Sequence, residues 1–165
     1  MDVSSGDLTR GIARMQHHLS EFRATGSETV TEYFIALIAT ALGRAQQFDE
    51  GLSTIEQAFP VIEKSDERCY EAEVHRLKGE LLLAKDASNA TQAEECLRTA
   101  IDIARHQMAK SWELRATTSL ARLLRDTNRR DEGRTMLAEI YNWFTEGFDT
   151  ADLKDAKALL EELRG

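Results

Sequence analysis

The chain has 165 residues, 42% of them apolar, and a formal charge of −8 from 29 acidic and 21 basic side chains. This length suits one compact domain or a short repeat array, and it can bury a core without disulfide bonds. The acidic balance disfavours a nucleic-acid binder, which must neutralise phosphates, and the two cysteines exclude a disulfide scaffold and a four-thiolate zinc site.

The N-terminal segment 1–7 is acidic and polar, unlike a signal peptide. The longest apolar stretch, 33–42, is interrupted by Thr40 and is too short to cross a bilayer. We therefore expect a cytoplasmic protein without a membrane partner.

Strong helix formers fill the chain, and no alternating apolar run reads as a strand, so we expect an all-α fold. The pattern predicts eight helices, at 7–24, 29–44, 48–64, 68–85, 91–108, 111–126, 130–146 and 150–163. Helix ends are predicted at Gly26 and Asn128, which tolerate positive φ, and at Gly147. Ser27 or Thr29 is the expected cap after Gly26, and capping boxes are predicted at Thr29-x-x-Glu32 and Thr91-x-x-Glu94.

Small residues recur in these helices with a period of 40 to 42 residues. The first helices of successive pairs carry Ala39, Gly79 and Ala121, and the second helices carry Gly51, Ala93 and Gly133, preceded one period earlier by Gly11. Within each pair the offsets are 12, 14 and 12 residues (39 to 51, 79 to 93, 121 to 133). A small residue lets two helix backbones approach closely, so a fixed offset predicts stacked helical hairpins.

The run Ile38-Ala39-x-x-Leu42, followed by Gly51, Ile55 and Ala58, resembles the tetratricopeptide motif, and two further copies are centred on Gly79 and Ala121. The motif's early Trp is absent, Lys78 replaces an apolar residue, and the period exceeds the usual 34. A HEAT-type array shares the period but fits the offset less well. The resemblance implies a right-handed superhelix of three hairpins (29–64, 68–108, 111–146), with helix 7–24 as a leading half-repeat and helix 150–163 as a cap.

Three segments, 70–83, 109–123 and 141–154, resemble the tetratricopeptide C-terminal region of large bacterial predicted ATPases, some of which carry a class III adenylate cyclase domain. The resemblance implies a regulatory or scaffold part of a signalling system. No Gly-x-x-x-x-Gly-Lys-[Ser/Thr] phosphate loop occurs in this chain, so no nucleotide chemistry is carried over to any residue here.

Residues that could support catalysis have ordinary structural explanations. His17 and His18 are adjacent on a helix and point about 100° apart, which suits no shared metal, and His18 falls on a packing position of the repeat. Cys69, beside Arg68 near a helix start, is the better candidate for a reactive thiol than Cys96, yet both are expected to be ordinary thiols. Paired acids such as Asp49-Glu50, Asp66-Glu67 and Glu94-Glu95 suit helix N-termini. We therefore expect a non-enzymatic protein without metal or cofactor.

In tetratricopeptide arrays the first helix of each pair lines a groove. Counting from the small residues, the candidate groove positions are Tyr33, Ala36, Thr40, Arg44, Glu73, Arg76, Glu80, Leu83, Arg115, Thr118, Arg122 and Arg125. Three arginines on one helical stripe suit a carboxylate or an acidic peptide. The alternative is that Arg115 and Arg122 pair with Glu73 and Glu80 of the neighbouring helix. The aromatic residues Trp112, Trp143, Phe144 and Phe148 either seal the last helix or form a docking surface.

These features leave three functional hypotheses: a module that binds a protein or peptide, an intramolecular sensor region of a signalling ATPase or cyclase-like protein, and a hydrolase hidden in the groove. A further expected partner is a second copy, because helix 7–24 lacks a hairpin partner. That lack should leave Ile12, Met15, Leu19 and Phe22 partly uncovered.

Overall fold

The computed structural model describes residues 3–25, 31–64 and 68–164, with side chains in the first segment described from Asp7 onward. This part of the chain is all-α and contains no strand, as expected. Its helices are α1 (Val3–Ala24), α2 (Thr31–Arg44), α3 (Phe48–Glu56), α4 (Phe59–Lys64), α5 (Glu71–Lys85), the 3₁₀ turn η1 (Ala87–Asn89), α6 (Ala90–His106), α7 (Lys110–Asp126), α8 (Arg130–Tyr141) and α9 (Ala151–Glu162).

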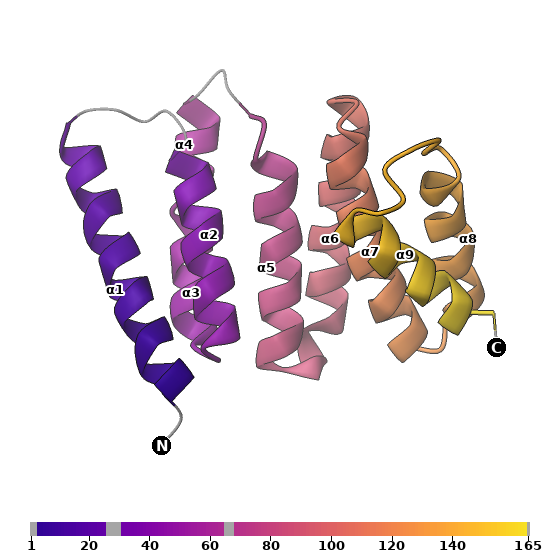
Figure 1. The fold of residues 1–165 in the computed structure, drawn as a ribbon, viewed down its shortest axis with the longest axis horizontal. Coiled ribbons are helices and arrows are strands. Elements are labelled where there is room, and N and C mark those ends of the chain that lie inside the picture. Colours follow the sequence, from indigo (N-terminus) through magenta and orange to yellow (C-terminus); the bar gives the residue numbers. More distant parts are fainter. Residues whose placement is uncertain (1–2, 26–30, 65–67, 165) are drawn as a thin grey trace.

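The helices follow one another in chain order along the long axis of the molecule, with α1 at one end and α8 and α9 at the other (Figure 1). Neighbours in sequence pack as hairpins, α2 with α3, α5 with α6, and α7 with α8. The helices α2, α5, α7 and α9 also contact one another in succession. They form one continuous row, which we call the first-helix row.

Glycines at the repeat positions set the closest approach inside two hairpins. A Cβ added to Gly79 would lie 2.9 Å from Cγ of Leu97 and 3.1 Å from the carbonyl oxygen of Ala93. A Cβ added to Gly133 would lie 3.1 Å from the carbonyl oxygen of Ala121. The predicted contact between Gly79 and the Ala93 region is therefore confirmed. Each glycine is used because any side chain would push the two backbones apart.

The predicted helix 48–64 is wrong as a single helix, because it divides into α3 and α4 at Gln57 and Ala58. Pro60 has no N–H to donate to the carbonyl of Glu56, and its ring would clash with that carbonyl in a continuous helix. The chain tightens instead, with the amides of Gln57 and Ala58 donating to carbonyls three residues back.

Other boundaries differ by a few residues. Helix α8 ends at Tyr141 rather than at residue 146, and α6 begins at Ala90, so Thr91 lies inside the helix and is not its cap. The positive φ expected at Asn128 is confirmed at 62°. Gly26, Ser27, Thr29, Asp66 and Glu67 lie outside the described residues.

Three clusters of buried apolar side chains run along the molecule. The first contains residues of every helix from α1 through α5. The second lies between α5, α6 and α7, and the third joins α7, α8 and α9. The expectation that Ile12 and Leu19 of α1 are partly uncovered is wrong. They are 4% and 8% exposed because they face α2 in the first cluster, whereas Met15 and Phe22 are half-buried.

A buried carboxylate ties the end of α6 to the start of α7. Glu113, 4% exposed, accepts from Nε of Arg105 at 2.8 Å and from Nζ of Lys110 at 2.7 Å. Burial by itself would raise the pKa of this carboxyl, but the hydrogen bonds and positive charges of Arg105 and Lys110 outweigh burial and lower the pKa.

We predict that Gly79→Leu destabilises the fold by about 1–3 kcal/mol through overpacking against Ala93 and Leu97. The matched control is Gly11→Leu in α1, where an added Cβ meets nothing within 4 Å and the fold should be unchanged or up to about 1 kcal/mol more stable. Urea denaturation of both variants measures the difference. Equal stability of the two variants would refute the hairpin register.

We predict that Glu113 stabilises the fold above the unfolded-state pKa of glutamate. Since the folded-state pKa is depressed, this contribution is lost as the pH falls below the unfolded-state pKa of about 4.3 and through the lower folded-state pKa. Denaturation of the wild type and of Glu113→Gln at a series of pH values should give a stability gap that narrows over this range. The control Glu161→Gln, exposed on α9, should give no such change. A constant gap for Glu113→Gln would contradict the prediction.

Candidate binding groove

Three adjoining hollows lie between successive members of the first-helix row. One, of about 400 Å³, lies between α2 and α5 and includes Thr40, Arg44 and Arg76. A second, of about 280 Å³, lies between α5, α7 and α9, and a third, of about 450 Å³, lies between α5 and α7. Glu80 lines all three, so the hollows adjoin one another along the first-helix row, and we call them together the groove.

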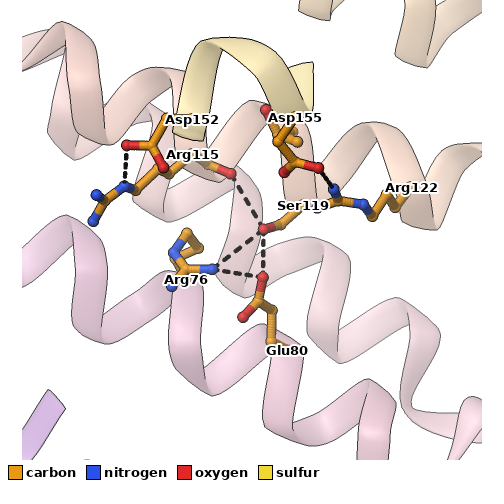
Figure 2. A pocket seen from close by; sticks show the side chains of 8 residues that line it. Arg76, Glu80, Arg115, Ser119, Arg122, Asp152 and Asp155 are labelled. Atoms are coloured by element: carbon orange, nitrogen blue, oxygen red, sulfur yellow. Dashed lines mark hydrogen bonds and ion pairs between the residues drawn. The ribbon is translucent and has the colours of Figure 1, made fainter. Parts of the chain in front are cut away.

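Arg76 is the half-buried cation at the centre of the groove. Its guanidinium donates to both carboxylate oxygens of Glu73, at 2.7 and 2.8 Å, and contacts Glu80 at 2.5 Å. Burial opposes the charge of Arg76, but the two carboxylates outweigh it and raise the pKa of the guanidinium above its ordinary value. The Ser119 hydroxyl of α7 donates to Glu80 at 2.6 Å (Figure 2). The centre of the groove is thus a fixed polar network between α5 and α7.

The arginines of α7 have partners that sequence reasoning did not anticipate. Arg115 donates through Nε to Asp152 at 2.7 Å, and Arg122 donates through a terminal nitrogen to Asp155 at 2.5 Å (Figure 2). Pairing of these arginines with Glu73 and Glu80 is therefore wrong. The reason is geometric, because α9 packs beside α7 and its first turns bring two carboxylates over the arginine stripe.

The remaining candidate positions differ in what their side chains contact. The hydroxyls of Thr40 and Thr118 donate to the carbonyls of Ala36 and Leu114 in their own helices, so neither hydroxyl hydrogen is free. Arg125 contacts Asp126 and Glu162, outside the central hollow. Ala36 is buried, and Leu83 lines the hollow between α5 and α7.

Tyr33 belongs to a row of aromatic rings rather than to the hollows. Its ring lies 5.5 Å from that of Phe34 and 5.2 Å from that of Tyr70, which lies 5.9 Å from Trp112. The guanidinium of Arg115 then lies 4.9 Å over the Trp112 ring. Three first helices are therefore linked near their N-terminal ends by aromatic side chains in tilted and edge-on contact.

The C-terminal aromatic residues divide between the two expectations. Phe144 packs against the third apolar cluster, whereas Trp143 and Phe148 are 58% and 46% exposed. Trp143 and Phe144 line a further hollow of about 590 Å³ with Leu114, Leu153 and neighbouring residues of the 142–150 segment, and it shares Asp152 with the hollow between α5, α7 and α9.

The histidine and cysteine candidates do not gather into one site among the described residues. His17 and His18 both contact the exposed Glu21, and His18 is exposed rather than partly buried, because none of the described helices covers that face of α1. Cys69 is exposed, and burial raises the pKa of the Cys96 thiol. Within the described ranges, no group of three or more His, Cys, Asp or Glu side chains is placed to hold a metal ion. Among the described helices, none combines the length and apolarity needed to span a membrane.

Sequence reasoning missed Ser119, Asp152 and Asp155 as groove residues. Asp152 lies in the first turn of α9 and Asp155 follows three residues later, so both fall on one helix face, opposite the arginines of α7. Charge complementarity between the two helices is the signal that could have paired them.

Comparison with known proteins yields a distant relative. A protein of Rhizobium meliloti (strain 1021), described as "Uncharacterized protein R02095", is 28% identical over 116 residues. The match covers 70% of this chain but 11% of the relative, so the chain spans a small part of a much longer protein. No family model matches the chain, and no solved structure matches it.

Proposed function

We propose that this chain is a non-enzymatic binding module of the tetratricopeptide type, which holds a protein segment or peptide in the groove of the first-helix row. In this proposal it works in the cytoplasm as a regulatory or scaffold part of a bacterial signalling system, without cofactor or nucleic acid.

The convergence of balanced charges in the central hollow carries this proposal. Side chains of α5, α7 and α9 supply three arginines and three carboxylates, listed with the other lining residues as Arg76, Glu80, Arg115, Thr118, Ser119, Arg122, Asp152 and Asp155. A peptide offers amide donors, carbonyl acceptors and charged side chains at short spacing, so it can engage both signs together. Polar groups with fixed partners also suit specificity more than raw affinity.

An acidic segment is the ligand that this groove favours most. Arg115 uses Nε for Asp152, and its two terminal nitrogens have no hydrogen-bond partner among the described residues. These two nitrogens form the edge of the guanidinium that accepts a carboxylate in bidentate fashion. The side chain is already ordered by its ion pair and by the Trp112 ring, which lowers the entropy cost of binding.

A second candidate is an intramolecular regulatory region of a signalling ATPase or cyclase-like protein. It is favoured by one observation, that the matching relative is far longer than the matched segment. Genomic DNA upstream of Met1 tests it. An open reading frame that continues upstream and encodes a phosphate loop would support this function, whereas a stop codon followed by a ribosome-binding site would support an independent module.

We predict that Arg115→Ala and Arg122→Ala each weaken the binding of an acidic peptide by about 1–3 kcal/mol, because each removes a charge-assisted hydrogen bond. Asp155→Asn should increase the affinity for the same peptide about fivefold, since it frees Arg122 from an exposed ion pair. Isothermal titration calorimetry with acidic peptides and their amide counterparts measures these changes.

The matched control for Asp155→Asn is Glu161→Gln, which removes a carboxylate from the same helix at a position outside the groove. The Glu161→Gln variant should bind the peptide with wild-type affinity. All four variants, the two arginine variants included, should fold normally. Absence of binding, or equal affinity in every variant, would refute the acidic-segment proposal.

A further inference from the structure

The exposed face of α1 differs from the corresponding face of every other second helix. In α3 and the following turn the stripe is Gly51, Ile55 and Ala58, and in α6 it is Ala93, Leu97 and Ala100. In α8 it is Gly133, Leu137 and Ile140. All of these residues are buried beneath a first helix.

The equivalent residues of α1 have no such cover. They are Gly11, Met15, His18 and Phe22, and we call them the α1 stripe. Gly11, Met15 and Phe22 are half-buried and His18 is exposed. An added Cβ at Gly11 would meet nothing within 4 Å, in contrast to the crowded Gly79 and Gly133. Beside the stripe lies an apolar hollow of about 280 Å³, lined by Met15, His18, Leu19, Phe22 and Phe34. α1 lies at the end of the molecule, with α2 on one side only (Figure 1).

We propose that a second copy of this chain covers the α1 stripe, and that two α1 helices pack antiparallel about a two-fold axis between Gln16 and His17. The stripe is symmetric about that point, with successive spacings of four, three and four residues. In this register the Phe22 ring of each copy faces Gly11 of the other, and Met15 faces His18. The open space at each glycine is thus filled by the bulkiest side chain of the stripe.

The charges beside the stripe favour the same arrangement. Arg14 and Glu21 are exposed and lie seven residues apart, so they share the flank of α1 opposite to the buried Ile12 and Leu19. Arg14 has no ion-pair partner among the described residues. In the antiparallel pair, Arg14 of one copy and Glu21 of the other lie on the same side and about 3 Å apart along the helix axis. The two-fold axis forms this ion pair twice.

A parallel pair would lose both kinds of complementarity. Gly11 would face Gly11 and leave a void, Phe22 would face Phe22, and the two-fold axis would put Arg14 of one copy and Glu21 of the other on opposite flanks, where they cannot pair. The antiparallel register is therefore the one that these residues fit. A single helix pair buries an area at the low end of specific interfaces, so the dimer should be weak, with a Kd of about micromolar or higher.

Charge reversal tests the register. Sedimentation equilibrium from micromolar to millimolar concentration should show a monomer–dimer equilibrium for the wild type. Arg14→Glu alone, or Glu21→Arg alone, should weaken association about tenfold, because each makes two repulsive contacts by symmetry. The double variant Arg14→Glu/Glu21→Arg should return to the wild-type affinity. Lys157→Glu, an equal charge change on exposed α9, should have no effect.

A larger side chain at Gly11 tests the packing of the two α1 helices. Gly11→Gln should abolish the dimer without lowering the melting temperature, because the new side chain meets open space in the monomer but occupies the place of the incoming Phe22. Ala13→Gln, on an exposed position of the same helix, is the matched control and should still dimerise. A strict monomer throughout the concentration range would overturn the proposal and assign the stripe to some other helix. A dimer that ignores both Gly11→Gln and the charge reversals would also overturn it.

Discussion

The close approach of paired helices at glycine is the constraint on which the rest of this molecule depends. At Gly79 and Gly133 the opposing carbonyl lies 3.1 Å from where a Cβ would be, so the two helices of each hairpin are held at backbone contact. Tight hairpins leave each second helix to fill the space beneath neighbouring first helices. The first helices then contact one another in a row, and their outward side chains line the groove.

Within that groove, the charged side chains are paired with one another. Arg76 is held by Glu73 and Glu80, and the arginines of α7 are held by Asp152 and Asp155 of α9. Since the pairs on α9 are partly exposed, each contributes little to stability, of the order of 0–1 kcal/mol. Their effect is on geometry, because they fix guanidinium groups that would otherwise sample many rotamers. A ligand therefore meets ordered groups of both signs.

The same residue type has opposite roles at the two ends of the fold. Gly79 is crowded by Ala93 and Leu97 of α6, and Gly11, one period before the glycine of α3, faces open space. The difference arises from neighbours and not from the residue, since among the described helices α1 has a first helix, α2, on one side only. That arrangement leaves His18 exposed, leaves Met15 and Phe22 half-buried, and creates the face on which the self-association proposal rests.

The amino-acid sequence by itself determined the all-α class, the order of the helices and the register of the hairpin around Gly79, because helix propensity and the spacing of small residues are local properties. It also placed Arg76, Arg115 and Arg122 on one side of the first helices. Sequence periodicity missed the division at Pro60, because the apolar pattern continues through a residue whose missing N–H breaks the helix. Only the tertiary structure decided that α9 supplies Asp152 and Asp155 to the groove, and that Ile12 and Leu19 are buried while His18 is not. Those outcomes depend on which helices lie side by side. The charge pattern of each helix is visible in the sequence, but it does not by itself say which helix, more than 30 positions away, lies opposite.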